Sequence, residues 1–121
     1  MSKQNLLYVQ TSGVNNPERL YSPLILAQTA VTMNIDAAVY FLGMGLTVVK
    51  KGEAEKIKIG SFPSLKEVLD NTIKAGVKLY VCAQSEQLLG LESGALIPEV
   101  EIVGAATLND LVLDADGTMW F

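Results

Sequence analysis

The chain alternates short apolar runs with longer segments whose apolar residues recur at helical spacing. Five of the runs predict strands: 5–10 (NLLYVQ), 37–42 (AAVYFL), 77–82 (VKLYVC), 100–103 (VEIV) and 118–121 (TMWF). The run at 37–42 is nearly all apolar, which is typical of a strand covered on both faces in a parallel sheet. In the run at 77–82, Val77, Leu79 and Val81 share one face, so Cys82 lies on the other face as the last residue of the strand.

The first helix is expected between the first two strands. Asn16 is suited to cap it and Pro17 to stand at its first position, and the apolar pattern continues to about Met33. Pro23 lies inside this segment and removes one backbone donor. The helix is therefore predicted either to kink at Pro23 or to restart with Ser22 as a cap.

Two further helices carry capping signals. Ser64 and Glu67 have the spacing of a capping box ahead of an apolar stripe, and Gly76 suits the carboxyl end of that helix. Thr107 and Asp110 repeat the spacing in a variant form with aspartate. These signals predict one helix before the third strand and one before the fifth.

The order of these elements predicts a single α/β domain over residues 1–121. Strands that alternate with helices form right-handed βαβ units, which build a mostly parallel sheet of about five strands between two helical layers. A chain of 121 residues is close to the usual size of one domain. Weaker helical patterns at 46–51 and 85–90 fit this arrangement, and the charged connector at 53–61 has no assignment.

The composition is rich in apolar residues for so small a protein. Half of the residues are hydrophobic and only 18% are charged, which leaves few polar side chains to cover the surface. Exposed apolar patches usually mark contacts, so we expect a homo-oligomer. The nine basic residues form no extended stripe and the formal charge is −4, so nucleic acid is not an expected partner.

Targeting and membrane segments are not expected in this chain. The amino-terminal residues lead into an apolar stretch of only Leu6–Val9, far shorter than the core of a signal peptide. No stretch has the roughly 20 apolar residues of a membrane span. We therefore expect a cytoplasmic protein without a membrane partner.

Histidine does not occur in the sequence. A Ser-His-Asp triad or a Cys-His pair within one chain is therefore excluded, and a single cysteine without histidine does not supply the usual ligands of zinc. The loop at 11–13 (TSG) stands where flavodoxin-type proteins bind a phosphate, but it lacks Gly-x-Gly-x-x-Gly and a Lys-Ser/Thr pair. We expect no metal ion and no cofactor.

Cys82 is the strongest candidate for chemistry. The ligand crevice of an open parallel sheet lies at the carboxyl ends of its strands, and the Cys82 thiol falls at that edge. A helix that opens at 83–85 would direct amide groups at the sulfur and favour the thiolate. A lone cysteine is also common as a small buried hydrophobic residue, so a purely structural role stays open.

Several stretches resemble the DsrE/DsrF-like sulfur-relay proteins, a family that includes the cysteine-bearing subunit of the TusBCD complex. The cysteine segment at 82–85 (CAQS), followed by 88–91 (LLGL), carries the most specific similarity. The family pattern is also matched, over nearly the whole chain, at 17–19 (PER), 26–27 (LA), 39–41 (VYF), 51–52 (KG), 76–77 (GV), 103–106 (VGAA) and Phe121.

This resemblance implies a three-layer, flavodoxin-like open sheet and assembly as a trimer or hexamer. It also implies that Cys82 carries sulfur as a persulfide or a thiosulfonate and works with TusA-like or rhodanese-like carrier proteins. Ser85 is the residue that we add to the site, as a hydrogen-bond donor to the thiolate or to the bound sulfur.

Two features differ from the relatives. A second cysteine is missing, so transfer would have to be intermolecular, and Gln87 stands where an acidic residue is frequent. The leading hypothesis is a sulfur carrier or sulfurtransferase whose Cys82 thiolate attacks the terminal sulfane sulfur of a donor and passes it to a partner thiol. The alternative is a non-catalytic oligomer subunit, or a small-ligand-binding module, with a buried cysteine.

Overall fold

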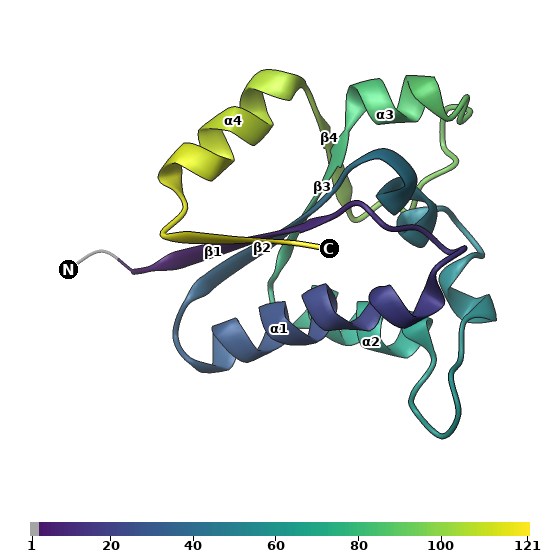
Figure 1. Ribbon diagram of the computed structural model, residues 1–121, viewed down its shortest axis with the longest axis horizontal. Helices are drawn as coiled ribbons and strands as arrows, with labels where there is room; N and C mark the ends of the chain where they lie inside the picture. The colour runs from purple at the N-terminus through teal and green to yellow at the C-terminus, as the bar shows by residue number, and fades with distance from the viewer. Residues whose placement is uncertain (1–2) are drawn as a thin grey trace.

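The structure is a computed structural model that describes residues 3–121. A five-stranded sheet runs through the centre of the protein (Figure 1). The predictions that no signal peptide is present and that one domain covers 1–121 extend to Met1 and Ser2, which lie outside the described residues. The strands are β1 (Asn5–Gln10), β2 (Asp36–Phe41), β3 (Lys78–Cys82), β4 (Val100–Val103) and β5 (Gly117–Trp120).

All four strand pairings are parallel, and the order across the sheet is β4-β3-β2-β1-β5. The predicted α/β class with a parallel sheet is therefore confirmed. The order differs from that of flavodoxin, where β1 lies between β2 and β3, because here the last strand pairs with the free edge of β1.

Helices cover both faces of the sheet, and they are α1 (Tyr21–Thr32), α2 (Leu65–Lys74), α3 (Ala83–Leu88) and α4 (Ala105–Asp114). Short 3-10 turns form at η1 (Pro17–Arg19), η2 (Gly43–Val49) and η3 (Ala54–Lys56). Figure 1 shows α1 and α2 on one face and α3 and α4 on the other. The helix α4 leads back across the sheet from β4 to β5, and a right-handed crossover in that direction lies on the face opposite α1 and α2.

The two faces of the sheet are covered very unequally. Because strand side chains alternate, Tyr8, Val39 and Val81 point into a large core against α1 and α2. The other face holds a smaller cluster of four buried residues, Leu7, Val9, Tyr40 and Cys82. The helix α4 above this cluster has no buried residue of its own.

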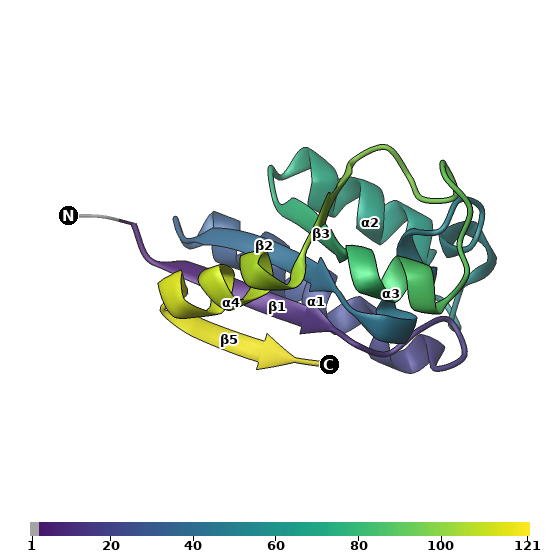
Figure 2. The ribbon, with the colours of Figure 1, turned by 90° about the horizontal axis from the view of Figure 1, so that it is seen from above.

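The last strand is fixed to the sheet by contacts at its start. The Asn5 backbone N–H donates to Oδ2 of Asp116 at 2.7 Å, and the Asn5 side-chain amide donates to the Asp114 carbonyl at 3.0 Å. The Asp116 N–H returns a bond to the Asn5 carbonyl at 2.9 Å. Figure 2 shows β5 beside β1 with α4 close to both. These bonds set the register of the pairing of β5 with β1.

The predicted start of the first helix was wrong. Pro17 opens the separate turn η1, the Asn16 side chain makes no cap bond, and α1 begins after Leu20. The helix does restart as expected, but not with Ser22 as its cap. Pro23 is the third residue of α1, where a backbone N–H has no intrahelical acceptor, so its ring costs no hydrogen bond.

The capping box predicted for the last helix was also wrong. The Thr107 N–H already bonds the Gly104 carbonyl at 3.1 Å, so Thr107 lies inside α4 and does not cap it. Ala105 and Ala106 are strong helix formers that extend the helix toward its amino end. The capping residue Ser64 was predicted correctly, since its hydroxyl accepts the Glu67 N–H at 3.2 Å.

Two weaker helical predictions were also displaced. The expected helix at 46–51 is instead the 3-10 turn η2, which only Leu42 separates from β2, and the helical turn expected at 85–90 begins two residues earlier as α3. None of the helices within residues 3–121 has the length and apolar character that crossing a bilayer requires.

Candidate active site around Cys82

Cys82 lies where β3 passes directly into α3. It is the last residue of the strand and the residue before the first turn of the helix, and its backbone is still extended (φ −74°, ψ 118°). The side chain is 5% exposed and belongs to the small cluster on the α3 and α4 face. The predicted position of the thiol at the carboxyl edge of the sheet is therefore the observed one.

Ser85 stands three residues after Cys82, within the first turn of α3, and its side chain is buried. Its Oγ accepts the backbone N–H of Gly43 at 2.8 Å. Because that bond uses a lone pair of the oxygen, the hydroxyl proton remains free to stabilise a thiolate, and Ser85 lowers the pKa of Cys82. The structure thus brings the two predicted residues together, and Ser85 also joins α3 to the loop after β2.

Backbone amides complete the surroundings of the thiol on the α3 side. Hydrogen bonding from the N–H groups of Ser85 and Gln84 lowers the pKa of Cys82, because these groups stabilise the thiolate. These groups are free to do so because the first N–H groups of a helix have no carbonyl to bond within the helix. The abrupt passage from β3 to α3 therefore places two fixed donors at the sulfur.

Burial and hydrogen bonding act on the thiol in opposite directions. Burial is the largest single influence and raises the pKa of Cys82, because it penalises the negative charge. The donors from Ser85, Tyr40 and Gln84 stabilise the thiolate and together outweigh burial, so the pKa of Cys82 lies below its ordinary value of 9.0. An inert buried cysteine has the opposite shift.

Tyr40 is a member of the site that sequence reasoning missed. Its side chain is fully buried, and within residues 3–121 its hydroxyl is the one buried side-chain oxygen or nitrogen that has no regular hydrogen bond. Tyr40 belongs to the same buried cluster as Cys82, and hydrogen bonding from Tyr40 lowers the pKa of that thiol by stabilising the thiolate. A neutral thiol is a weak hydrogen-bond acceptor, so the Tyr40 hydroxyl is unpaired while Cys82 is protonated. A thiolate is a strong acceptor, so the same hydroxyl stabilises Cys82 once the thiol has lost its proton.

The sequence held little that would have identified Tyr40. In the run at 37–42 every residue is apolar or aromatic, so the pattern does not tell which face each side chain takes. The register shows it: Tyr40 pairs with Tyr80, and Cys82 is the next residue on the same face of β3. That register depends on long-range pairing and not on local pattern.

The loops after β1 and β2 are locked against each other at the same edge. A Cβ at Gly45 would overlap the Gln10 carbonyl, and one at Gly13 would overlap the Met44 carbonyl. The N–H groups of Thr11 and Ser12 donate to the Phe121 carbonyl at 2.5 and 3.2 Å. Two of the three amides in the loop at 11–13 are therefore already bonded within the chain.

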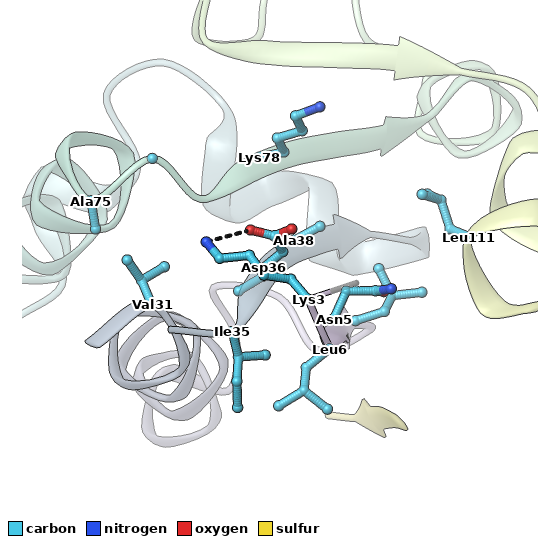
Figure 3. Close-up of a pocket in the computed structure, with 13 residues that line it drawn as sticks. Lys3, Asn5, Leu6, Val31, Ile35, Asp36, Ala38, Ala75, Lys78 and Leu111 are labelled. Carbon is cyan, nitrogen blue, oxygen red and sulfur yellow. Dashed lines mark hydrogen bonds and ion pairs between the residues drawn. The ribbon is translucent and has the colours of Figure 1, made fainter. Parts of the chain in front are cut away.

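A cavity of about 500 Å³ opens at the opposite edge of the sheet. Figure 3 shows the ion pair of Lys3 and Asp36 among the residues that line it, together with Lys78 and the apolar side chains of Val31 and Leu111. The Lys3 Nζ lies 3.4 Å from the Asp36 carboxylate, and both side chains are mostly exposed. Because this cavity lies at the amino ends of the strands and none of its described lining residues is a cysteine, serine or threonine, we place the candidate chemistry at Cys82 and not here.

Among residues 3–121, no three histidine, cysteine or acidic side chains gather in a group that could hold a metal ion. The donors around Cys82 lower the pKa of its thiol, so the chemistry that this site supports is that of a stabilised thiolate. Such a group attacks electrophilic sulfur and also departs readily from it.

Comparison with known proteins shows the kinship of the chain. The family model described as "DsrE/DsrF-like family" matches residues 4–121. The uncharacterized protein MJ0989 of Methanocaldococcus jannaschii is 32% identical over 102 residues, which cover 84% of this chain and 83% of MJ0989. The uncharacterized protein MJ0760 of the same organism is 31% identical over 102 residues, and these cover 84% of this chain but 37% of MJ0760. The chain thus spans well under half of that relative.

Two solved structures have a similar fold. The ychN protein of E. coli superposes with a TM-score of 0.81 at 22% identity, over 98% of this chain and 99% of that one. MTH1491 of Methanobacterium thermoautotrophicum, described as a protein of unknown function, superposes with a TM-score of 0.66 at 12% identity, over 99% and 100% of the two chains. With a family match that covers nearly every residue, the chain belongs to the DsrE/DsrF-like family, a family of the sulfur-relay type.

Proposed function

We propose that this protein is a sulfur carrier that holds sulfane sulfur on Cys82 and passes it to a thiol of a partner protein. In the loading step the Cys82 thiolate attacks the terminal sulfur of a donor persulfide or polysulfide. A bond forms between Sγ and that sulfur, the donor's sulfur–sulfur bond breaks, and the electron pair leaves with the donor thiolate. The sulfane sulfur passes from the donor to Cys82 with no net oxidation or reduction.

One observation carries this proposal: the buried Cys82 sulfur is surrounded by hydrogen-bond donors that lower its pKa despite burial. A thiolate is the attacking species in sulfur exchange, and here it forms without a histidine. The family membership supports the same type of chemistry, since the family is one of sulfur relay.

The loading step is tested by intact-mass measurement. The purified protein is incubated with polysulfide, thiosulfate or tetrathionate and weighed before and after reduction, beside the Cys82→Ser variant. The proposal expects an adduct of sulfur, or of a thiosulfonate group with tetrathionate, that reduction removes and that the variant never acquires. If the mass of the unsubstituted protein were unchanged after incubation with every donor, the proposal would be contradicted.

The low exposure of Cys82, 5%, favours a second candidate, a non-catalytic subunit whose cysteine is only a packing residue. Thiol alkylation of the folded protein separates the two candidates. A carrier is alkylated rapidly, with a pH midpoint below that of the unfolded chain, whereas a packing residue is labelled only as fast as the protein opens.

The proposed partners follow from the single cysteine. With one thiol per chain, the accepting thiol has to come from another protein, and we propose TusA-like or rhodanese-like carriers for this role. We also propose that the protein works as a homo-oligomer, a trimer or a hexamer, in a reducing compartment such as the cytoplasm that keeps the thiol free. Exposed apolar side chains on α3, α4 and β5 support the assembly: Leu88, Leu113, Met119 and Trp120.

A further inference from the structure

We propose that Tyr40 is a positioning residue of this site: its phenol O–H bonds the Cys82 sulfur whenever that sulfur is negatively charged, and so promotes release of sulfur to the acceptor. This inference rests on the proposed function for its transfer step. The bond between Tyr40 and the thiolate can be tested without any sulfur transfer.

The geometry places the phenol at the thiol and holds it there. Tyr40 and Tyr80 are paired across β2 and β3, and Cys82 follows Tyr80 by one step on the same face. The rings of Tyr40 and Tyr80 stack, with centroids 6.5 Å apart and planes at 27°. Since the Tyr40 side chain is fully buried, its ring has little freedom to turn elsewhere.

The phenol differs from the other donors because nothing else uses it. Ser85 already accepts the Gly43 N–H, and the two amides belong to the first turn of α3. The Tyr40 hydroxyl has no regular hydrogen bond to any residue within 3–121, although it is buried. Most buried polar groups are paired, so an unpaired hydroxyl against a nucleophilic sulfur indicates a partner that exists only in another charge state.

That charge state recurs at two points of the transfer cycle. It exists in the free protein before loading, and it returns when the acceptor thiolate attacks the outer sulfur of the Cys82 persulfide. In that second step a bond forms between the acceptor sulfur and the outer sulfur, the bond from Sγ to the outer sulfur breaks, and the electron pair remains on Sγ. The proton of the persulfide stays on the transferred sulfur, so atoms and charges balance.

The negative charge therefore returns to Sγ as the sulfur departs, and Tyr40 donates to it at that moment. A leaving thiolate that is stabilised departs faster. The phenol itself remains protonated, because burial first and the neighbouring Cys82 charge second raise the pKa of Tyr40. Tyr40 thus acts as a fixed donor and not as an acid that gives up its proton.

Tyr40→Phe tests this role, with Tyr80→Phe as the matched control. Both variants lose one phenol oxygen from the same face of neighbouring strands, but only the first loses the contact with Cys82. The pH profile of Cys82 alkylation is recorded for both. For Tyr40→Phe we expect a higher midpoint and a roughly tenfold smaller thiolate fraction at neutral pH, whereas Tyr80→Phe retains the midpoint of the unsubstituted protein. Equal midpoints for all three proteins would overturn the inference.

The transfer step is measured on protein loaded in advance with polysulfide. Sulfur transfer from loaded Tyr40→Phe to a small thiol is expected to be several-fold slower than from loaded Tyr80→Phe, and equal rates would contradict the release role. If none of the proteins loads, the proposed function fails, while the alkylation midpoints still decide whether Tyr40 bonds the thiolate.

A measurement on the unsubstituted protein covers the case in which Tyr40→Phe does not fold. With tyrosine labelled by ¹³C at the phenol carbon, one of the four tyrosine signals should move with the same pH midpoint as Cys82 alkylation. That movement should be lost in Cys82→Ala. If every tyrosine signal is constant through the Cys82 midpoint, the hydroxyl does not bond the thiolate and the inference is wrong.

Discussion

At the scale of single residues, Ser85 has two partners that would otherwise be unrelated. Its oxygen accepts the Gly43 N–H from the loop after β2, and its hydroxyl lowers the pKa of Cys82 at the end of β3 by stabilising the thiolate. A serine at this position therefore stabilises both the thiolate and the join between α3 and η2. The two effects are separable by experiment.

Ser85→Ala is expected to raise the pKa of Cys82 and to slow its alkylation several-fold at neutral pH, because one donor to the thiolate is lost. The free energy of unfolding should fall by about 1 kcal/mol, since the Gly43 N–H loses its acceptor. Alkylation kinetics and urea unfolding measure the two quantities. Ser22→Ala, an exposed serine in the first turn of α1, should change neither. Unaltered alkylation of Ser85→Ala would show that the hydroxyl does not act on the sulfur.

The lowered pKa of Cys82 also makes stability depend on pH. Between the pKa of the folded state and the ordinary value of 9.0, the unfolded chain retains a proton that the folded chain has lost. The unfolded state therefore binds more protons, and the free energy of unfolding rises with pH across this window. The contribution of Cys82 ionisation to the free energy of unfolding is complete above pH 9.0, and it is lost as the pH falls through the pKa of the folded state.

The unfolding free energy of the unsubstituted protein minus that of Cys82→Ser should accordingly increase from neutral pH to pH 9.0. Denaturant unfolding of both proteins at several pH values measures this difference. Burial raises the pKa of Tyr8, Tyr21 and Tyr40, so these phenols do not titrate within the window. A difference that is flat or falls with pH would mean that folding does not favour the thiolate.

At the scale of elements, the site depends on how the loops at the carboxyl edge pack together. One residue separates the turn η2 from the end of β2. Gly45 within this turn lies directly against the Gln10 carbonyl at the end of β1. The first residue of this turn, Gly43, supplies the N–H that orients Ser85. Close approach of two backbones thus holds the serine beside the thiol.

Gly45→Ala should disrupt this packing, because the added Cβ would overlap backbone that has no room to move aside. We expect a loss of about 3 kcal/mol or more in unfolding free energy, together with a higher pKa of Cys82. Gly104→Ala is the matched control, since a Cβ there meets nothing within 4 Å, and it should cost no more than about 1 kcal/mol, as expected for glycine at a helix cap. Thermal unfolding and alkylation follow both effects. Equal stability of the two variants would contradict the close approach.

The elements were predictable from the sequence to different degrees, for physical reasons. The strands at 5–10 and 100–103 were predicted to the residue, and the other three within one residue at each end, because buried strands leave apolar runs. The cap at Ser64 was predictable because its partner is three residues away. The starts of α1 and α4 were not, because tertiary packing and alanine propensity outweighed the local capping signals.

The same distinction applies to the site. Ser85 follows Cys82 by three residues, so one helical turn brings them together, and this pair was accessible to sequence reasoning. Tyr40 lies 42 positions before Cys82, and only the register of β2 with β3 places its phenol at the thiol. The bond from Gly43 to Ser85 likewise depends on how two loops meet.

At the scale of the whole molecule, the face that holds Cys82 is incompletely covered. The helix α4 is largely apolar yet has no buried residue, and Leu113 at its end is 82% exposed. On the same side, Leu88 of α3 is 77% exposed and Trp120 of β5 is 52% exposed. A monomer would present these side chains to water, which is the pattern expected where subunits meet.

Leu113→Glu should therefore weaken the proposed homo-oligomer, because it places a charge in an apolar interface. Sedimentation velocity should show smaller species than for the unsubstituted protein at the same concentration. Met33→Glu, which alters an exposed apolar residue at the end of α1 on the opposite face, should retain the parent assembly. A monomer in the unsubstituted protein, or no change with Leu113→Glu, would contradict assembly through α4.

The central claim is that Cys82 takes up sulfur and gives it away. The most direct measurement is the intact mass of protein loaded with polysulfide, freed of the donor and mixed with a thiol-bearing acceptor protein, with Cys82→Ser treated in parallel. We predict that the chain loses the mass of its added sulfur while the acceptor gains it, and that nothing moves in the Cys82→Ser sample. A chain that never gains sulfur, or that retains it in the presence of the acceptor, would contradict the proposed role of Cys82.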